Sequence, residues 1–180
     1  MRDALARVLL VAASALTAQT ATAGQASAAA AAVSAQQQGN AMAAALLRED
    51  YLRVAATACS PVLARVGGVQ ALARQIEVGF KVMQQQGRRL VDMRFGAVDA
   101  LVEGAATRFA LIPYRSVVLV RDGRLSLESF YLGVQNVDGD AWCFIDTAAL
   151  NPAILHELFP GAPETLRLPA PAAPLLETPP

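Results

Sequence analysis

The spacing of the apolar residues predicts helices in the first half of the chain. Over residues 41–59 apolar side chains recur at helical spacing, and Asn40 can cap this helix by accepting hydrogen bonds from its first free N–H groups. Ser60 and Pro61 end the helix, because proline disfavours the helical conformation in the residue before it. The segment "PVLARVGG" that follows is predicted to be a turn.

A second helix is predicted by a more regular apolar stripe. The stripe consists of Val69, Leu72, Ile76, Phe80 and Met83. An apolar stripe at this spacing is typical of an amphipathic helix. Gly87 suits a left-handed C-cap at its end, a conformation that glycine adopts without steric cost.

Beyond this helix the apolar positions recur with a period of about 2, which is typical of strands. In "RLVDMRFG" the residues Val91, Met93 and Phe95 share one face. In "ATRFALI" the inward residues are Phe109 and Leu111. Each segment therefore predicts a half-buried strand.

A hairpin and a short helix follow these strands. "RSVVLVRDGRLSLESFYLGV" predicts two strands joined at Asp122 and Gly123, a pair that suits a type I′ turn because both central residues need positive φ. In "NPAILHELF" Asn151 can cap a helix that starts with Pro152. Together the pattern predicts an α+β fold, with N-terminal helices packed on a mostly antiparallel sheet of about five strands and a short C-terminal helix.

The last predicted strand lies in "DGDAWCFIDT". Trp142 and Phe144 point to one face of this strand, and Cys143 and Ile145 point to the other. Apolar residues on both faces are typical of a strand in the interior of a sheet, covered on each side. The strand is therefore interpreted as part of the core rather than as a site.

The two ends of the chain differ from its middle in composition. Residues 1–23 combine a basic start, an apolar run and the small residues of a cleavage site, which is the pattern of a secretory signal peptide. Residues 24–40 are rich in alanine and glutamine and are interpreted as a linker, and residues 169–180 as a proline-rich disordered tail. The single folded domain is expected at residues 41–168.

Charge and export narrow the classes of partner. The 15 basic residues balance the 15 acidic residues, which gives no electrostatic reason to bind nucleic acid. A signal peptide predicts a periplasmic or secreted protein, with no stable membrane anchor once the signal has been removed.

Export also gives meaning to the two cysteines. In an oxidising compartment Cys59 and Cys143 can form a disulfide, which would stabilise the fold by about 4 to 5 kcal/mol in the chain-entropy model. The alternative is two buried thiols that act as small hydrophobic side chains. The free thiols are the favoured interpretation, because sequence alone does not bring the two Cβ atoms together.

The order of these segments resembles the nuclear transport factor 2-like (cystatin-like) superfamily, and more specifically small exported bacterial proteins. The resemblance rests on "DYLRVAATACSPVLARVGG", "FYLGVQNVDGDAWCFID" and "LHELFPGAPETLRLP". It implies a cone-shaped fold in which N-terminal helices lie across a strongly curved sheet. The superfamily includes dehydratases, isomerases, binding proteins and immunity proteins, and its sheets often pair in homodimers.

Enzymes of that superfamily use buried Asp/His or Asp/Tyr arrangements, which directs attention to five candidate residues. These are Asp92, Tyr114, Tyr131, Asp146 and His156. His156 is expected to be a surface or packing residue, Asp92 to face solvent beside Arg94, and the tyrosines to belong to the core or the cover of the sheet.

Metal and cofactor motifs give no positive signal. Asn136, Asp138 and Asp140 alternate in "NVDGD", but these are the ordinary residues of a tight turn, and a calcium loop of the EF-hand type needs about twelve residues. We expect neither a metal nor a cofactor.

Two functional hypotheses remain. The favoured one is an exported, non-catalytic module that binds a small apolar ligand or a protein partner through a concave sheet. The alternative is a cavity enzyme of the dehydratase or isomerase type, with Asp92 or Asp146 as base and a tyrosine as electrophile. The alternative requires at least two of the five candidates to converge within hydrogen-bond reach in one pocket.

Overall fold

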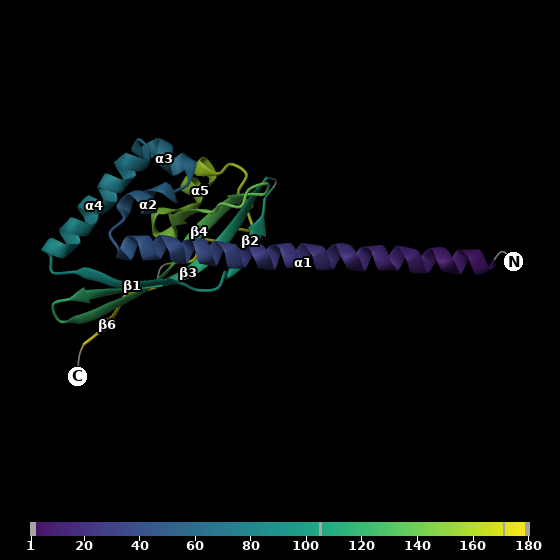
Figure 1. The fold of residues 1–180 in the computed structure, drawn as a ribbon, viewed down its shortest axis with the longest axis horizontal. Helices are drawn as coiled ribbons and strands as arrows, with labels where there is room; N and C mark the ends of the chain where they lie inside the picture. Colours follow the sequence, from purple (N-terminus) through teal and green to yellow (C-terminus); the bar gives the residue numbers. More distant parts are fainter. Residues whose placement is uncertain (1–2, 105, 171, 179–180) are drawn as a thin grey trace.

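The computed structural model describes residues 3–104, 106–170 and 172–178, with side chains from residue 25 onward. It has an α+β fold, as predicted, in which helices come first and an open antiparallel sheet follows. The helices are α1 (Asp3–Leu47), α2 (Tyr51–Ala56), α3 (Ser60–Val66), α4 (Val69–Gln85) and α5 (Pro152–Leu158). The strands are β1 (Arg89–Phe95), β2 (Ala100–Glu103), β3 (Thr107–Val120), β4 (Gly123–Asn136), β5 (Cys143–Asp146) and β6 (Leu175–Glu177). Figure 1 shows α1 as a rod that lies across the sheet and extends far beyond it.

The sheet is built around the long hairpin β3–β4. The strand order is β1-β3-β4-β5, while β2 also pairs with β3 and β6 also pairs with β4. The two predicted strands "ATRFALI" and "RSVVLV" are one strand, β3, which passes through Pro113 without a break. Pro113 has no N–H to donate, but its carbonyl accepts a hydrogen bond of 2.8 Å from the N–H of Gly96. The sequence pattern did not predict β2 or β6, which have four and three residues.

Two details of the predicted strands are wrong. The hairpin closes at the pair Val120 and Gly123, so Asp122 lies in the loop and Gly123 in the strand. Of the residues at this turn, only Gly123 has positive φ, at 150°. A type I′ turn needs positive φ at both loop residues, so the turn is not type I′. In β1 the register shifts between Leu90 and Asp92, which leaves Val91 exposed instead of buried.

The first predicted helix is two helices. α1 continues to Leu47, and the chain then turns through Glu49, which has a φ of 60°. Asp50 starts α2 by accepting a hydrogen bond from the N–H of Arg53 at 3.1 Å. The predicted turn after Ser60 is α3, because proline is well tolerated in the first turn of a helix.

The predictions for α4 and α5 are confirmed. α4 spans Val69–Gln85, and Gly87 follows it with a φ of 72°. α5 starts after Asn151, whose side chain accepts a hydrogen bond from the N–H of Ile154 at 2.9 Å. In both cases the residues that end or start the helix act as their local chemistry predicts.

The predicted linker, residues 24–40, is helical and its second half packs on the sheet. Ala31, Ala35 and Gly39 are buried. Small side chains let the backbone approach closely, and a Cβ added at Gly39 would lie 3.0 Å from the ring of Phe95. Asn40 is not a cap, because the helix runs through it and its side chain accepts a hydrogen bond from the N–H of Phe95 at 3.0 Å. The folded body therefore begins about ten residues before the predicted boundary.

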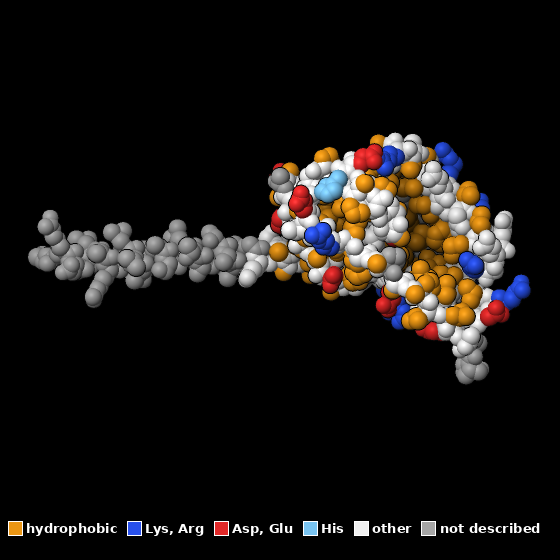
Figure 2. Space-filling model, turned by 180° about the vertical axis from the view of Figure 1, so that it is seen from behind, with side chains coloured by type: hydrophobic (Ala, Val, Ile, Leu, Met, Phe, Trp, Pro, Cys, Tyr) orange, Lys and Arg blue, Asp and Glu red, His pale blue; other side chains and the backbone are white. Residues whose placement is uncertain are grey.

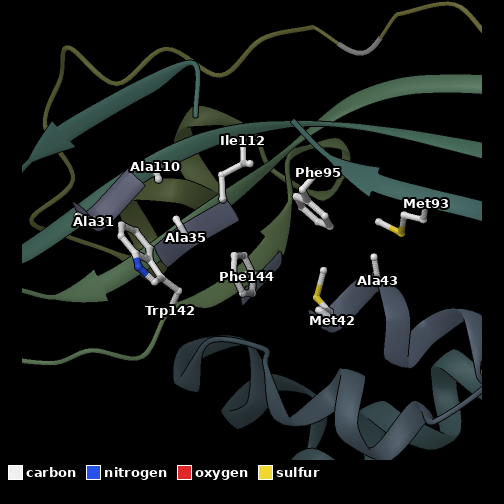
Figure 3. Close-up of a cluster of buried hydrophobic side chains, with 10 residues drawn as sticks. All are labelled: Ala31, Ala35, Met42, Ala43, Met93, Phe95, Ala110, Ile112, Trp142 and Phe144. Carbon is white, nitrogen blue, oxygen red and sulfur yellow. The ribbon is translucent and has the colours of Figure 1, made fainter. Parts of the chain in front are cut away.

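Both faces of the sheet are covered. The helix-side core, between α1 and the sheet, is drawn in Figure 3. It consists of Ala31, Ala35, Met42, Ala43, Met93, Phe95, Ala110, Ile112, Trp142 and Phe144. A second core lies on the opposite face, where α5 and the segment after it cover residues such as Phe109 and Leu132.

The strand β5 has the predicted facing but not the predicted place. Trp142 and Phe144 belong to the helix-side core, while Cys143 and Ile145 pack with the second core. However, β5 is an edge strand. The connection between α2 and α3 covers its outer side, where Phe144 donates a hydrogen bond of 2.9 Å to the carbonyl of Thr57.

The same connection carries one half of a disulfide. Cys59 and Cys143 are bonded, with their Cα atoms 4.8 Å apart. The favoured interpretation of two free thiols is thus wrong. The bridge between Ala58 and Phe144 brings the neighbouring cysteines together, and this contact between distant segments leaves no trace in the sequence.

The end of the chain is also more ordered than predicted. In the segment interpreted as a disordered tail, β6 pairs with Arg124–Ser126 of β4. All three residues of β6 remain exposed, so the tail adds backbone hydrogen bonds but little apolar burial. Within the described part of the chain, no helix combines the length and the apolar character that crossing a membrane requires.

Candidate functional site

Three of the five candidate residues come together on the helix-facing side of the sheet. Tyr114 lies on β3, Tyr131 on β4 and Asp146 at the end of β5. In the register of the sheet Tyr131 lies directly opposite Asp146, and Tyr114 lies opposite Ser129. Because the cross-strand neighbours of a sheet point to the same face, these four side chains form one group, which we call the tyrosine–aspartate group.

Hydrogen bonds fix the carboxylate of this group. The hydroxyl of Tyr114 donates to Oδ2 of Asp146 at 3.2 Å. Oδ1 of Asp146 accepts the N–H of Ala148 at 2.9 Å and so caps the short 3-10 helix Thr147–Ala149. The rings of Tyr114 and Tyr131 meet edge to face, with their centroids 5.0 Å apart.

Burial and the carboxylate keep both tyrosines neutral. Burial, reinforced by the charge of Asp146 and only partly offset by the hydroxyl of Ser129, raises the pKa of Tyr114 to about 12. The pKa of Tyr131 is also raised, by burial first and then by Asp146 and Tyr114. The hydroxyl of Ser129 is buried and forms no hydrogen bond of good geometry with any described residue. The group thus combines one fixed carboxylate, two neutral phenols and one hydroxyl without a partner.

Buried aromatic rings pack beside this polar group. The ring of Phe95 lies between the helix and the tyrosines, with its centroid 5.9 Å from that of Tyr114 and 5.3 Å from that of Tyr131. Phe144 extends the same cluster, with its ring 6.2 Å from Phe95. Buried aromatic side chains of the helix-side core therefore pack directly against the polar group.

The helix α4 adds an apolar side that the fold covers only in part. Its apolar stripe is strongly segregated to one side, yet none of its residues is buried. α4 packs on α2, where Phe80 meets Tyr51 at a centroid distance of 5.4 Å, and it touches the sheet mainly near the start of β1. Figure 2 shows a hollow lined by hydrophobic side chains between α4 and the end of the β3–β4 hairpin.

The other two candidates lie elsewhere. Asp92 is on the opposite face of β1, where its Oδ1 lies 3.1 Å from Nε of Arg94. His156 is exposed on α5 and lines an open groove of about 650 Å³ between that helix and residues 164–170. The five candidates therefore do not share one pocket, although Tyr114 and Asp146 are within hydrogen-bond reach of each other.

Among the residues that the structure describes, no three His, Cys, Asp or Glu side chains are grouped closely enough to hold a metal ion. The segment with Asn136 is a turn, in which the N–H of Gly139 donates to the carbonyl of Asn136 at 2.9 Å.

Sequence reasoning missed two parts of the site. Ser129 shares the face of Tyr131 because the two are separated by one residue in a strand, so the period of the strand could have identified it. The open side of α4 could not have been predicted, because an apolar stripe looks the same whether a core covers it or not.

The comparisons with known proteins leave the family open. No protein-family model, curated protein or solved structure matched the chain. The resemblance to the nuclear transport factor 2-like superfamily therefore stays a prediction, and the function has to be argued from the site.

Proposed function

We propose that this protein is a non-catalytic module that holds a small apolar ligand between α4 and the helix-facing side of its sheet. The observation that carries the proposal is the partly exposed apolar stripe of α4 beside a hydrophobic hollow. Exposed apolar surface that is contiguous and concave is typical of a binding site, because leaving it in water costs about 25 cal/mol per Å².

The shape of the surface favours a small ligand over a protein partner. Ligand sites are concave and mostly apolar, with a few polar groups that fix the orientation of the ligand. The hollow has this composition if the tyrosine–aspartate group supplies the polar contacts. A protein partner would instead need an apolar area that reaches beyond the hollow.

A matched pair of substitutions on α4 tests the proposal. Ile76 lies within the apolar stripe and is half-buried, whereas Val78 is 60% exposed on another side of the same helix. We expect the protein to bind the neutral fluorescent probe N-phenyl-1-naphthylamine, Ile76→Gln to weaken binding by about tenfold, and Val78→Gln to leave it unchanged.

Circular dichroism must show that both variants remain folded. Equal effects of the two substitutions, or no binding by the unchanged protein, would refute the apolar site. If the probe does not bind but a protein captured from a cell extract binds in an Ile76-dependent way, the site holds a protein partner instead.

The hydrogen bond between Tyr114 and Asp146 supports a second candidate, a cavity enzyme of the dehydratase or isomerase type. Asp146 would act as base and a neutral tyrosine as electrophile. Turnover of a hydroxy- or keto-substrate that is lost in Asp146→Asn would establish this activity. The binding module is preferred because both oxygens of Asp146 already accept hydrogen bonds.

The proposal includes export to the periplasm or the extracellular space. The signal pattern of residues 1–23 supports it, and so does the disulfide, since such bonds persist mainly in oxidising compartments. Cleavage after Ala23 would leave every described buried residue in place, because the first of them is Ala31. Mass spectrometry of the protein from the periplasmic or culture fraction should therefore find Gly24 at its N-terminus.

A further inference from the structure

We infer that the ligand of this hollow carries a hydrogen-bond-donating polar end, an alcohol or an amine, and that the site discriminates against a carboxylate on the same apolar chain. The inference rests on the proposed function and names the class of ligand. It follows from the directions of the hydrogen bonds, from the charge and from one buried hydroxyl of the tyrosine–aspartate group.

The directions of the hydrogen bonds leave acceptors facing a ligand. A phenol has one proton to donate, and Tyr114 gives it to Oδ2 of Asp146. The remaining lone pairs of Tyr114 and Asp146 can only accept. Both side chains are half-buried, so part of their surface stays accessible. A ligand that donates a proton therefore satisfies Tyr114 and Asp146, whereas one that only accepts leaves these two side chains without a further partner.

The charge acts in the same direction. The charge of Asp146 raises the pKa of both tyrosines, and no basic residue contributes to either pKa. Among the described residues, no Arg, Lys or His forms an ion pair with Asp146. Arg94 and Arg115 lie opposite each other in the register of β1 and β3, on the face away from Phe95 and Tyr114, and their ion-pair partners are Asp92 and Glu177. A carboxylate in the hollow would meet negative charge without a cation to offset it.

Ser129 provides an independent observation. Its side chain is 5% exposed, and its hydroxyl forms no hydrogen bond of good geometry with a described residue, although it is close enough to Tyr114 to lower the pKa of that phenol. A buried hydroxyl without a partner costs free energy, so it is expected to gain one when the site is filled. Because Ser129 lies across from Tyr114, a ligand hydroxyl or amine at Tyr114 is placed to form this bond.

The experiment compares decan-1-ol, decylamine and decanoate as competitors of the neutral probe at neutral pH. These ligands share one apolar chain length and differ in their polar end. We expect the alcohol and the amine to displace the probe at concentrations about tenfold lower than decanoate.

Asp146→Asn tests the cause of this preference. An asparagine keeps the acceptor for the N–H of Ala148, but it removes the charge and turns the contact with Tyr114 into a donor. Tyr114 must then accept from the amide, and its own proton becomes free for the ligand. We expect decanoate to approach the alcohol to within about threefold in this variant. The control Asp92→Asn, on the opposite face, should keep the full preference.

The outcomes separate this inference from the proposed function. If the probe does not bind the unchanged protein, the apolar site fails and the inference fails with it. If the probe binds but decanoate competes as well as the alcohol, or if Asp146→Asn leaves the preference unchanged, only the polar-end inference is overturned.

Discussion

A pair of glycine-to-alanine substitutions tests whether the alanine-rich part of α1 is held against the sheet. Gly39 lies in α1 and Gly79 in α4, and both have ordinary helical backbone geometry. In the middle of a helix alanine is more stable than glycine by about 0.5 to 1 kcal/mol. Gly79→Ala should gain this amount, since a Cβ there meets nothing within 4 Å.

At Gly39 the same methyl group presses on a buried ring. The added Cβ would lie 3.0 Å from Cγ and Cδ1 of Phe95, which is 4% exposed and packed against other aromatic rings. Phe95 would have to move by a few tenths of an ångström, and overpacking of this kind costs about 1 to 3 kcal/mol. The free energy of unfolding of Gly39→Ala should therefore lie between that of the unchanged protein and a value about 2 kcal/mol lower. This is roughly 1 to 3 kcal/mol below the free energy of unfolding of Gly79→Ala.

Urea unfolding measures this difference. Trp142 is the only tryptophan and lies in the helix-side core, so its fluorescence reports the unfolding of the region in question. Gly39→Ala stabilising the protein as much as Gly79→Ala would show that residue 39 is not packed against Phe95. The segment 24–40 would then be the linker that its composition suggests.

Three further predictions concern the core and the site. Replacing both Cys59 and Cys143 by alanine should destabilise the fold by about 4 to 5 kcal/mol, because the disulfide closes a loop with a sequence separation of 84; a reducing agent should have no effect on this variant. Trp142→Ala should cost about 3 to 5 kcal/mol, and an unchanged melting temperature would remove this residue from the core. Ultraviolet absorbance should show that Tyr114 ionises near pH 12 in the unchanged protein and at lower pH in Asp146→Asn. The pKa of Tyr114 is higher in the folded than in the unfolded chain. Its contribution to the free energy of unfolding is therefore complete below about pH 10 and is lost as the pH rises towards 12.

The sequence predicted those elements whose pattern is local. The apolar stripe of α4 follows the period of a helix, and the division of the β5 side chains between two faces follows the period of a strand; the structure has both. Gly87 and Asn151 were identified because their roles depend on local backbone chemistry alone. In each case the information lies within one turn or a few residues of a strand.

The missed features depend on contacts between distant segments. The packing of α1 relies on the close approach of Gly39 to Phe95 and on the amide of Gln38, which accepts the N–H of Trp142 at 2.9 Å. The composition of an alanine-rich segment does not indicate that it packs on a sheet. Its lack of large apolar residues suggests instead that it is an unpacked linker. The edge position of β5 and the disulfide likewise require the path of the chain between α2 and α3.

The candidate site was partly within reach of the sequence. Tyr114, Tyr131 and Asp146 could be named from their residue types, but a shift of the register by one residue would have turned a tyrosine to the other face. The pairing of Tyr131 with Asp146 therefore needed the structure. The structure was also needed to exclude Asp92 from the group. Its residue type made it a candidate, but the register of the sheet places it on the opposite face.

The hollow is held open by the way both ends of α4 are attached. At its N-terminal end α4 follows α3, and the disulfide at Cys59 ties the start of α3 to β5. At its C-terminal end α4 continues through Gly87 into β1, the strand at the other side of the sheet. A helix attached at two opposite sides of the sheet is held away from the strands between them, and its apolar stripe stays partly exposed. If the hollow holds a ligand as proposed, the disulfide also keeps this surface in place before the ligand arrives, and such preorganisation increases affinity.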